Sequence, residues 1–204
     1  TTGEYNSIFG YQSGDAITTG NLNVAMGRSA LGSETIGIST VAIGDNAGSQ
    51  QNFGSHGATG NVMVGSGAGF WNVTGAGNTY LGASAGTGAG SNSNNNNTGV
   101  GNAALTSITT GNQNTVMGHS AGRNITTGTS NVIIGRVAGY ATTDVDKAVI
   151  IGEQAGYTGN MTSAADGTVS IGSGAGKNVT SAAESTFVGF GAGANVTTGN
   201  YNTA

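Results

Sequence analysis

Few side chains of this sequence could do chemistry, and those that could are scattered along it. The chain has two histidines, nine carboxylates and no cysteine in 204 residues. A zinc site needs three or four such ligands close together, but His56 lies in an inserted segment and His119 has no acidic neighbour. Asp144 and Asp146 lie close to each other, beside Lys147, as is typical of a solvated turn. We therefore predict no catalytic residue, no metal ion and no cofactor, and expect that the chain is not an enzyme.

Residues 172–179, with the sequence GSGAGKNV, resemble a phosphate-binding loop. The first glycine of that motif is missing at the required spacing, and Asn178 stands where a serine or threonine would bind magnesium. The glycine-rich calcium-binding pattern of other solenoids is also absent. We reject a nucleotide site at this segment and interpret it as one unit of a repeat.

Cationic and aromatic residues recur at matched spacing in the second half of the chain. Arg123, Tyr140 and Tyr157 are 17 residues apart, and Lys177 follows 20 residues later. Phe70 and Trp71 occupy the same place, or the place beside it, earlier in the chain. If repeat units stack, these residues form a stripe whose rings and cations suit a sugar. The alternative is that they only pack on one another.

The spacing follows from a repeat that runs through the whole sequence. Each unit contains a glycine after two apolar residues, which we call the anchor glycine, and seven of the ten intervals between anchors are 17 residues. Ten of the eleven units have alanine three residues after the anchor. The anchors are Gly10, Gly27, Gly44, Gly65, Gly82, Gly101, Gly118, Gly135, Gly152, Gly172 and Gly189. A unit of this length is shorter than the known helical repeats and suits one coil of a β-solenoid.

The repeat predicts an all-β fold, a parallel β-solenoid of about eleven coils, in one domain over residues 1–204. The chain starts and ends within a repeat, so we expect it to be a segment of a longer fibre protein. Forty glycines could indicate collagen or disorder, but glycine does not recur at every third position and proline is absent. Regularly placed apolar residues and a net charge of −4 disfavour disorder.

Each unit is expected to form two short strands. The first precedes the anchor, as in 131–135, and the second is the tail, as in 124–128, with Ile17, Ile108, Ile125, Val179 and Val196 pointing inward. In the first strand, alternation places the residues one and three before the anchor on one face, and we predict that this face lines the coil. Asparagines that follow the tail glycine, such as Asn112, suit either a turn or a hydrogen-bonded ladder.

The residue two before the anchor is then predicted to point outward, although it is mostly apolar. A contiguous apolar stripe on a surface is typical of an interface, and we predict that it packs against identical chains. A flanking domain that covers the stripe, or the reverse orientation of the strand, would also explain the pattern. The predicted self-association face includes Ile8, Met63, Tyr80, Val116, Ile133, Ile150 and Phe187.

Segments such as 114–122 (NTVMGHSAG) and 131–139 (NVIIGRVAG) resemble the repeats in the heads of trimeric autotransporter adhesins, and residues 101–118 are similar to repeats of bacteriophage tail fibres. The resemblance covers essentially the whole chain, but it rests on low-complexity motifs and the repeat here is longer. It implies a left-handed β-roll, an intertwined or side-by-side homotrimer, and a place outside the cell, on a cell surface or virion. The implied function is a rigid spacer and attachment module, whose partners would be itself and a surface glycan or host receptor.

The five Lys and Arg residues are spread over the chain, which argues against binding of nucleic acid. The sequence contains no run of 18 apolar residues, so we expect no insertion into a membrane. Two other functions remain open. Threonine pairs such as Thr126–Thr127 could order water as in an ice-binding solenoid. A polysaccharide-binding or depolymerising tailspike would need paired carboxylates in a groove, for which Asp144 and Asp146 are the nearest match.

Overall fold

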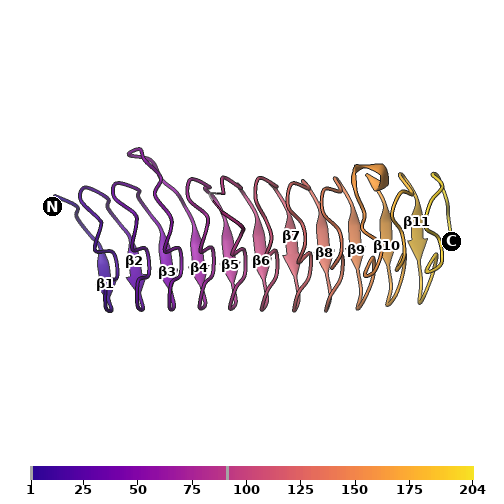
Figure 1. The fold of residues 1–204 in the computed structure, drawn as a ribbon, viewed down its shortest axis with the longest axis horizontal. Helices are drawn as coiled ribbons and strands as arrows, with labels where there is room; N and C mark the ends of the chain where they lie inside the picture. The colour runs from indigo at the N-terminus through magenta and orange to yellow at the C-terminus, as the bar shows by residue number, and fades with distance from the viewer. Residues whose placement is uncertain (1, 91) are drawn as a thin grey trace.

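The computed structural model describes residues 2–90 and 92–204, and its secondary structure is one parallel sheet with a single short helical turn. Eleven three-residue strands stack in chain order along a rod (Figure 1). They are β1 (Ser7–Phe9), β2 (Val24–Met26), β3 (Val41–Ile43), β4 (Val62–Val64), β5 (Thr79–Leu81), β6 (Thr98–Val100), β7 (Thr115–Met117), β8 (Val132–Ile134), β9 (Val149–Ile151), β10 (Val169–Ile171) and β11 (Thr186–Val188), with the 3-10 turn η1 (Ser163–Ala165) before β10. The predicted all-β parallel solenoid of about eleven coils is confirmed.

Equivalent residues of neighbouring coils lie side by side. Strand β8 pairs with β9 in a register that puts Ile134 opposite Ile151, and every other neighbouring pair of strands keeps the same register. The longer units place their extra residues outside this register, so the segment between β3 and β4 projects beyond the other coils and η1 lies between β9 and β10 (Figure 1). Repeats of unequal length therefore still stack in columns.

The anchor glycines are required by the stacking of backbone on backbone. Gly135 has φ +134°, and a Cβ atom built on it would lie 2.5 Å from the carbonyl oxygen of Gly152 in the next coil. No other residue type tolerates both this conformation and this close approach. Gly189 has the same φ, but no further coil lies against it, and its Cβ would meet only Ala192.

The predicted orientation of the first strand is wrong. The middle residue of each strand, two before the anchor, points into the coil, and the residues on either side of it point outward. Ile133 and Ile150 are fully buried, whereas the flanking residues of β8 and β9 are half-buried. The predicted self-association face is therefore part of the core. Its members Met63, Tyr80, Val116, Ile133, Ile150 and Phe187 are fully buried, and only Ile8, in the first coil, is exposed.

The physical reason for this orientation is the asparagine four residues before the anchor. Strand alternation puts this residue on the same face as the residue two before the anchor, and the asparagine is buried because its amide bonds to the next coil. Asn114 Oδ1, for example, accepts bonds from the backbone nitrogen and Nδ2 of Asn131, at 3.1 and 2.9 Å, while its own Nδ2 donates to Gly128. An inward asparagine therefore brings the middle strand residue inward with it.

Core volume is conserved by exchange between two columns. Most coils have a large residue in the middle of the strand and glycine four residues after the anchor. Leu105 replaces that glycine in the coil where the middle residue is Gly99, and Leu31 replaces it where the middle residue is Ala25. Both leucines are fully buried. In these two coils the leucine supplies the large apolar side chain that the strand lacks, whereas Ala42 with Gly48 and Ser170 with Gly176 have a large side chain in neither column.

The tail of each unit lies extended beside the next tail, but it does not form a second regular sheet. Thr109 N donates to Thr126 O at 2.9 Å, and only isolated bridges such as Ser181 with Thr198 occur in the tails. The predicted second strand is therefore reduced to single contacts, because its turns interrupt the ladder after one or two bonds. The inward direction of its apolar residues is confirmed: Ile17, Ile108, Ile125 and Val179 are buried and Val196 packs against the core.

Two ladders of side-chain bonds run along the rod in opposite directions. The buried asparagines just described form the inner ladder, which is continuous over Asn61, Asn78, Asn97, Asn114 and Asn131. In the outer ladder, the asparagine after the tail glycine accepts a bond from the preceding coil, as Asn112 Oδ1 does from Asn95 N at 2.6 Å. The predicted ladder is confirmed at these outer positions, and the inner ladder is an addition to it.

Candidate functional site

The outward residues of the eleven strands form a surface that we call the outer strand face. It consists of the first and third residues of each strand. The third residue is always large and apolar, and Phe9, Leu81 and Val188 expose 75, 47 and 57% of their surface. The first residue is valine, threonine or serine, and no residue of the face carries a charge. An uncharged sheet face with a continuous apolar column along its length is typical of an interface.

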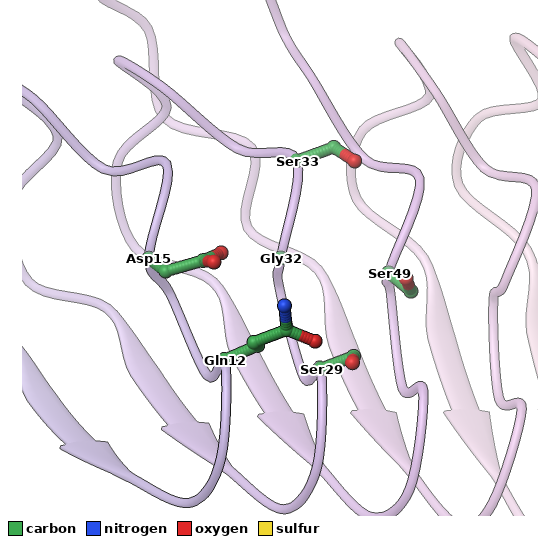
Figure 2. A pocket seen from close by; sticks show the side chains of 6 residues that line it. All are labelled: Gln12, Asp15, Ser29, Gly32, Ser33 and Ser49. Carbon is green, nitrogen blue, oxygen red and sulfur yellow. The ribbon is translucent and has the colours of Figure 1, made fainter.

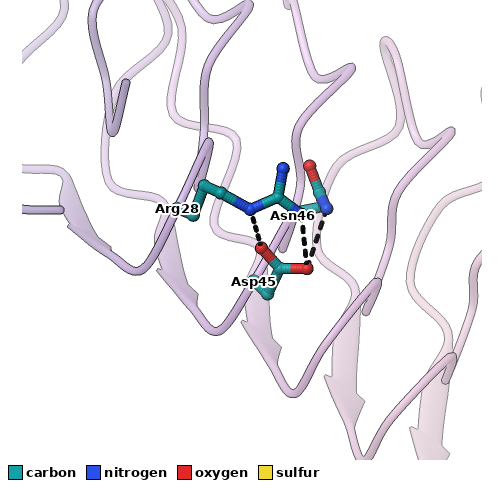
Figure 3. Close-up of polar contacts among 3 residues, drawn as sticks. All are labelled: Arg28, Asp45 and Asn46. Atoms are coloured by element: carbon teal, nitrogen blue, oxygen red, sulfur yellow. Dashed lines mark hydrogen bonds and ion pairs between the residues drawn. The ribbon is translucent and has the colours of Figure 1, made fainter. Parts of the chain in front are cut away.

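Charged residues lie beside this face and neutralise one another between coils. Arg28 Nε lies 2.8 Å from Asp45 Oδ1, and Asp45 Oδ2 also accepts a bond from Asn46 Nδ2 (Figure 3). Arg136 forms the equivalent ion pair with Glu153. Both arginines directly follow an anchor glycine, so the pairs border the outer strand face without adding net charge to it.

The predicted cation-aromatic residues come together as a continuous stripe. Arg123 Nη1 donates to the Tyr140 hydroxyl at 2.9 Å, and its guanidinium carbon lies 5.6 Å from the centre of that ring. The Tyr140 and Tyr157 ring centres are 5.5 Å apart at an angle of 51°. Lys177 Nζ lies 6.0 Å from the centre of the Tyr157 ring. We call these four residues the cation-aromatic stripe.

The other predicted ligand-binding pair lies apart from this stripe. Phe70 occupies the same column, five residues after its anchor, but Thr87 and Thr106 separate it from Arg123. Phe70 and Trp71 pack edge to face with ring centres 5.0 Å apart, and Trp71 is 37% exposed. They form a separate aromatic contact and do not extend the stripe.

A polar hollow of about 200 Å³ lies in the same column near the N-terminus. Gly32 has no side chain between Asp15 and Ser49, and this gap forms the floor of the hollow (Figure 2). Gln12, Ser29 and Ser33 complete its lining. One carboxylate without a basic or acidic partner does not make an acid–base pair, so the hollow carries no catalytic arrangement. The sequence feature that indicates this hollow is Gly32, because the other coils have a residue with a side chain at this position, five residues after the anchor glycine.

The residues considered for chemistry are dispersed in space as well. Asp146 accepts a bond from Thr129 and Asp144 accepts one from Thr143, both within the turns. His56 Nε2 lies 3.4 Å from Thr19 Oγ1, and His119 is exposed. Within residues 2–90 and 92–204, no three His, Cys, Asp or Glu side chains lie close enough together to hold a metal ion.

The sequence analysis missed the burial of one carboxylate, which lies at a position where five of the eleven coils have isoleucine or valine. Glu34 is fully buried. Its Oε1 accepts bonds from three consecutive backbone nitrogens, 35 to 37, at 2.8–3.2 Å. Gln51 Nε2 and Phe53 N donate to its Oε2 at 3.0 and 3.3 Å. Five donors hold this carboxylate at the start of the projecting loop, which is a structural role.

A buried tyrosine is held in a similar way. The Tyr80 hydroxyl donates to Asn94 Oδ1 at 2.5 Å, inside the coil. Burial raises the pKa of Tyr80 well above its ordinary value because removal from water disfavours the phenolate. The hydroxyl therefore stays protonated as a donor and offers no acid or base at neutral pH.

The threonine pairs proposed for ice binding are partly engaged within the solenoid. Thr109 Oγ1 donates to Thr126 O at 3.0 Å, and Thr126 Oγ1 donates to Thr143 O at 3.3 Å. Thr18 and Thr180 make the same bond to the next coil. The hydroxyl protons of Thr18, Thr109 and Thr126, each the first threonine of a pair, are therefore engaged in bonds that hold coils together.

Comparison with family models, curated proteins and solved structures finds no match to this chain. Among the described residues, no helix is long and apolar enough to cross a membrane.

Proposed function

We propose that this chain is a rigid, self-associating segment of an extracellular fibre, which acts as a spacer and holds an attachment module away from a cell or virion. The observation that carries the proposal is the outer strand face. Twenty-two outward side chains on eleven stacked strands lack any charge. A sheet face that is exposed to water normally carries mostly polar side chains.

A second copy of the same chain is the occupant that fits this face best. The face is straight, its columns repeat with the coil spacing of about 4.8 Å, and another copy offers columns with the same spacing. A homo-oligomer with closed symmetry buries one equivalent face per chain. Three chains around an axis are the arrangement that we propose, in line with the resemblance to trimeric adhesin heads and tail fibres.

Mass in solution tests the proposal. Light scattering during size-exclusion chromatography should give three times the chain mass of 19.7 kDa. Replacement of two outward residues, Ile134→Asp with Ile151→Asp, should give single chains that keep the circular dichroism of the parent, because both side chains are half-exposed in one chain.

The matched control is Thr127→Asp with Thr110→Asp, which adds the same charge at exposed residues of the tails. This variant should keep the mass of the parent. A parent that stays a single chain at high micromolar concentration would overturn the proposal, and so would equal loss of assembly in the control.

A further inference from the structure

The two rings of the cation-aromatic stripe are in contact with each other and with the two cations. Each tyrosine has the other ring on one side, and a cation approaches it from the neighbouring coil: Arg123 at Tyr140 and Lys177 at Tyr157. Flat stacking of a sugar or a base on the side of a ring that a neighbour occupies would displace a contact that the chain already makes.

The edges of the two rings carry positive potential. An aromatic ring is negative on its faces and positive around its edge, and two cations terminate the column. The Tyr140 hydroxyl accepts the bond from Arg123, which leaves its own proton free to donate. Arg123 has further N–H groups beyond the one that it uses. The stripe therefore offers donors and positive charge toward solvent.

The distribution of cations concentrates this charge. The sequence has five Lys and Arg against nine Asp and Glu. Arg28 and Arg136 are neutralised by ion pairs, and among the described residues no ion pair involves Arg123, Lys147 or Lys177. Two of these three lie on the stripe. Over three coil steps the stripe spans roughly 14 Å, so it suits anionic groups spaced along an extended chain.

Polar residues directly follow three of the four stripe residues in the chain, whereas Ala141 follows Tyr140. We call these three polar residues the polar row. It consists of Asn124, Thr158 and Asn178, and the Thr158 hydroxyl bonds to Asn178 Oδ1. Amides and hydroxyls in a row can bond the hydroxyl groups of sugars, whereas nucleic acid would need free aromatic faces for its bases. We propose that the stripe binds an acidic polysaccharide, with carboxylate groups at Arg123 and Lys177 and sugar hydroxyls along the polar row.

This inference goes beyond the proposed function and is separate from it. The stripe shares no residue with the outer strand face, so loss of glycan binding would leave the mass of the assembly unchanged. Assembly would present one stripe per chain and strengthen binding of a long polymer through multivalency. Binding is therefore measured with short oligosaccharides, which can contact the stripe of only one chain at a time, so that multivalency does not contribute to the affinity.

Isothermal titration of the whole 204-residue chain with oligogalacturonate, at low and at physiological salt, tests the inference. We expect binding that weakens with salt, and a loss of about tenfold or more in Arg123→Gln with Lys177→Gln, since charge-assisted bonds are the strong ones. Lys147→Gln is the matched control, because it removes an exposed cation away from the stripe and should change affinity less than about twofold. Circular dichroism of each variant establishes that it is folded.

Four results would overturn the inference. They are no binding of oligogalacturonate at millimolar concentration, equal binding of neutral dextran fragments, an equal loss in Lys147→Gln, and tighter binding of single-stranded oligothymidylate than of oligogalacturonate. Tyr157→Phe provides a further test. It keeps the ring contact but removes a hydroxyl donor, and it should weaken binding less than the double cation variant while leaving thermal stability close to that of the parent.

Discussion

The two faces of the same eleven strands differ in how their side chains vary. The inward column ranges from glycine to tyrosine and phenylalanine, and two of its small members, Ala25 and Gly99, are compensated by Leu31 and Leu105. The outward column formed by the third residue of each strand is apolar in every coil, and each of its residues is at least partly exposed. A column whose packing is completed within the chain can vary as long as a neighbour compensates. The outward column has no such neighbour, and this is the basis for proposing that another copy covers it.

The adjacent residues Ile133 and Ile134 give the sharpest test of this difference. Ile133→Ala should lower the free energy of unfolding by about 2–5 kcal/mol, because it removes a fully buried side chain and leaves a cavity. Ile134→Ala, measured in dilute solution, should cost about 1 kcal/mol or less, because its side chain is half-exposed in a single chain. Chemical denaturation followed by circular dichroism checks both values. Equal costs would contradict the orientation described here.

The two asparagine ladders provide a second comparison, between buried and half-buried polar groups. Asn114→Ala leaves the buried backbone nitrogen of Asn131 and the oxygen of Gly128 without their partners and removes one of the bonds of Asn131 Nδ2, and it should cost about 2–3 kcal/mol. Asn112→Ala removes one half-buried bond to Asn95 and should cost about 1 kcal/mol. Thermal unfolding of the two variants measures the difference. A larger loss in Asn112→Ala would show that the outer ladder holds the coils together.

Exchange of volume within the core can be tested with a double-mutant cycle. A Cβ atom on Gly99 would lie 3.0 Å from Tyr80 Cδ1 and 3.4 Å from Leu105 Cδ1, so Gly99→Ala alone should destabilise the chain by about 1 kcal/mol. In the Leu105→Ala background the same change fills part of a cavity, and we expect a favourable coupling of about 1 kcal/mol. Additive costs would mean that the two columns do not share one space.

The smallest expected effect concerns the backbone of an outward residue. Val137 has φ 51°, in the left-handed region that β-branched residues disfavour. Val137→Asn should raise the free energy of unfolding by about 1 kcal/mol, since asparagine tolerates this conformation better. Gln154 has φ 57° in the next coil, and Gln154→Asn is the control that should gain less. No gain in Val137→Asn, checked by its unfolding midpoint, would indicate that the valine side chain makes a stabilising contact.

The sequence alone was sufficient for the architecture but not for the orientation of the strands. Anchor spacing predicted the coils and the pairing of Ile134 with Ile151, because backbone stacking tolerates only glycine at the anchor. The alternation of side chains along a strand predicts which residues share a face. When both faces carry apolar residues, it does not predict which face points into the coil. The exchange between Leu105 and Gly99 was the signal that could have decided it, since only residues in one shared space need to compensate each other.

The candidate surfaces could be predicted in part. Matched spacing placed Arg123, Tyr140, Tyr157 and Lys177 in one column, because columns follow directly from the repeat. It could not show how the two rings and the two cations contact one another, which depends on side-chain packing between coils. The burial of Glu34 was also missed, because its partners include backbone nitrogens whose direction is set by the local turn.

Cross-linking between copies tests the central claim, that the outer strand face joins identical chains. The chain has no cysteine, so a single Ile134→Cys substitution introduces one thiol on that face, and Ile133→Cys introduces one inside the coil. With a short thiol-specific cross-linker, we expect Ile134→Cys to give covalently joined chains in gel electrophoresis and Ile133→Cys to give none. Single chains from Ile134→Cys, in a sample whose thiols are shown to react, would contradict the account.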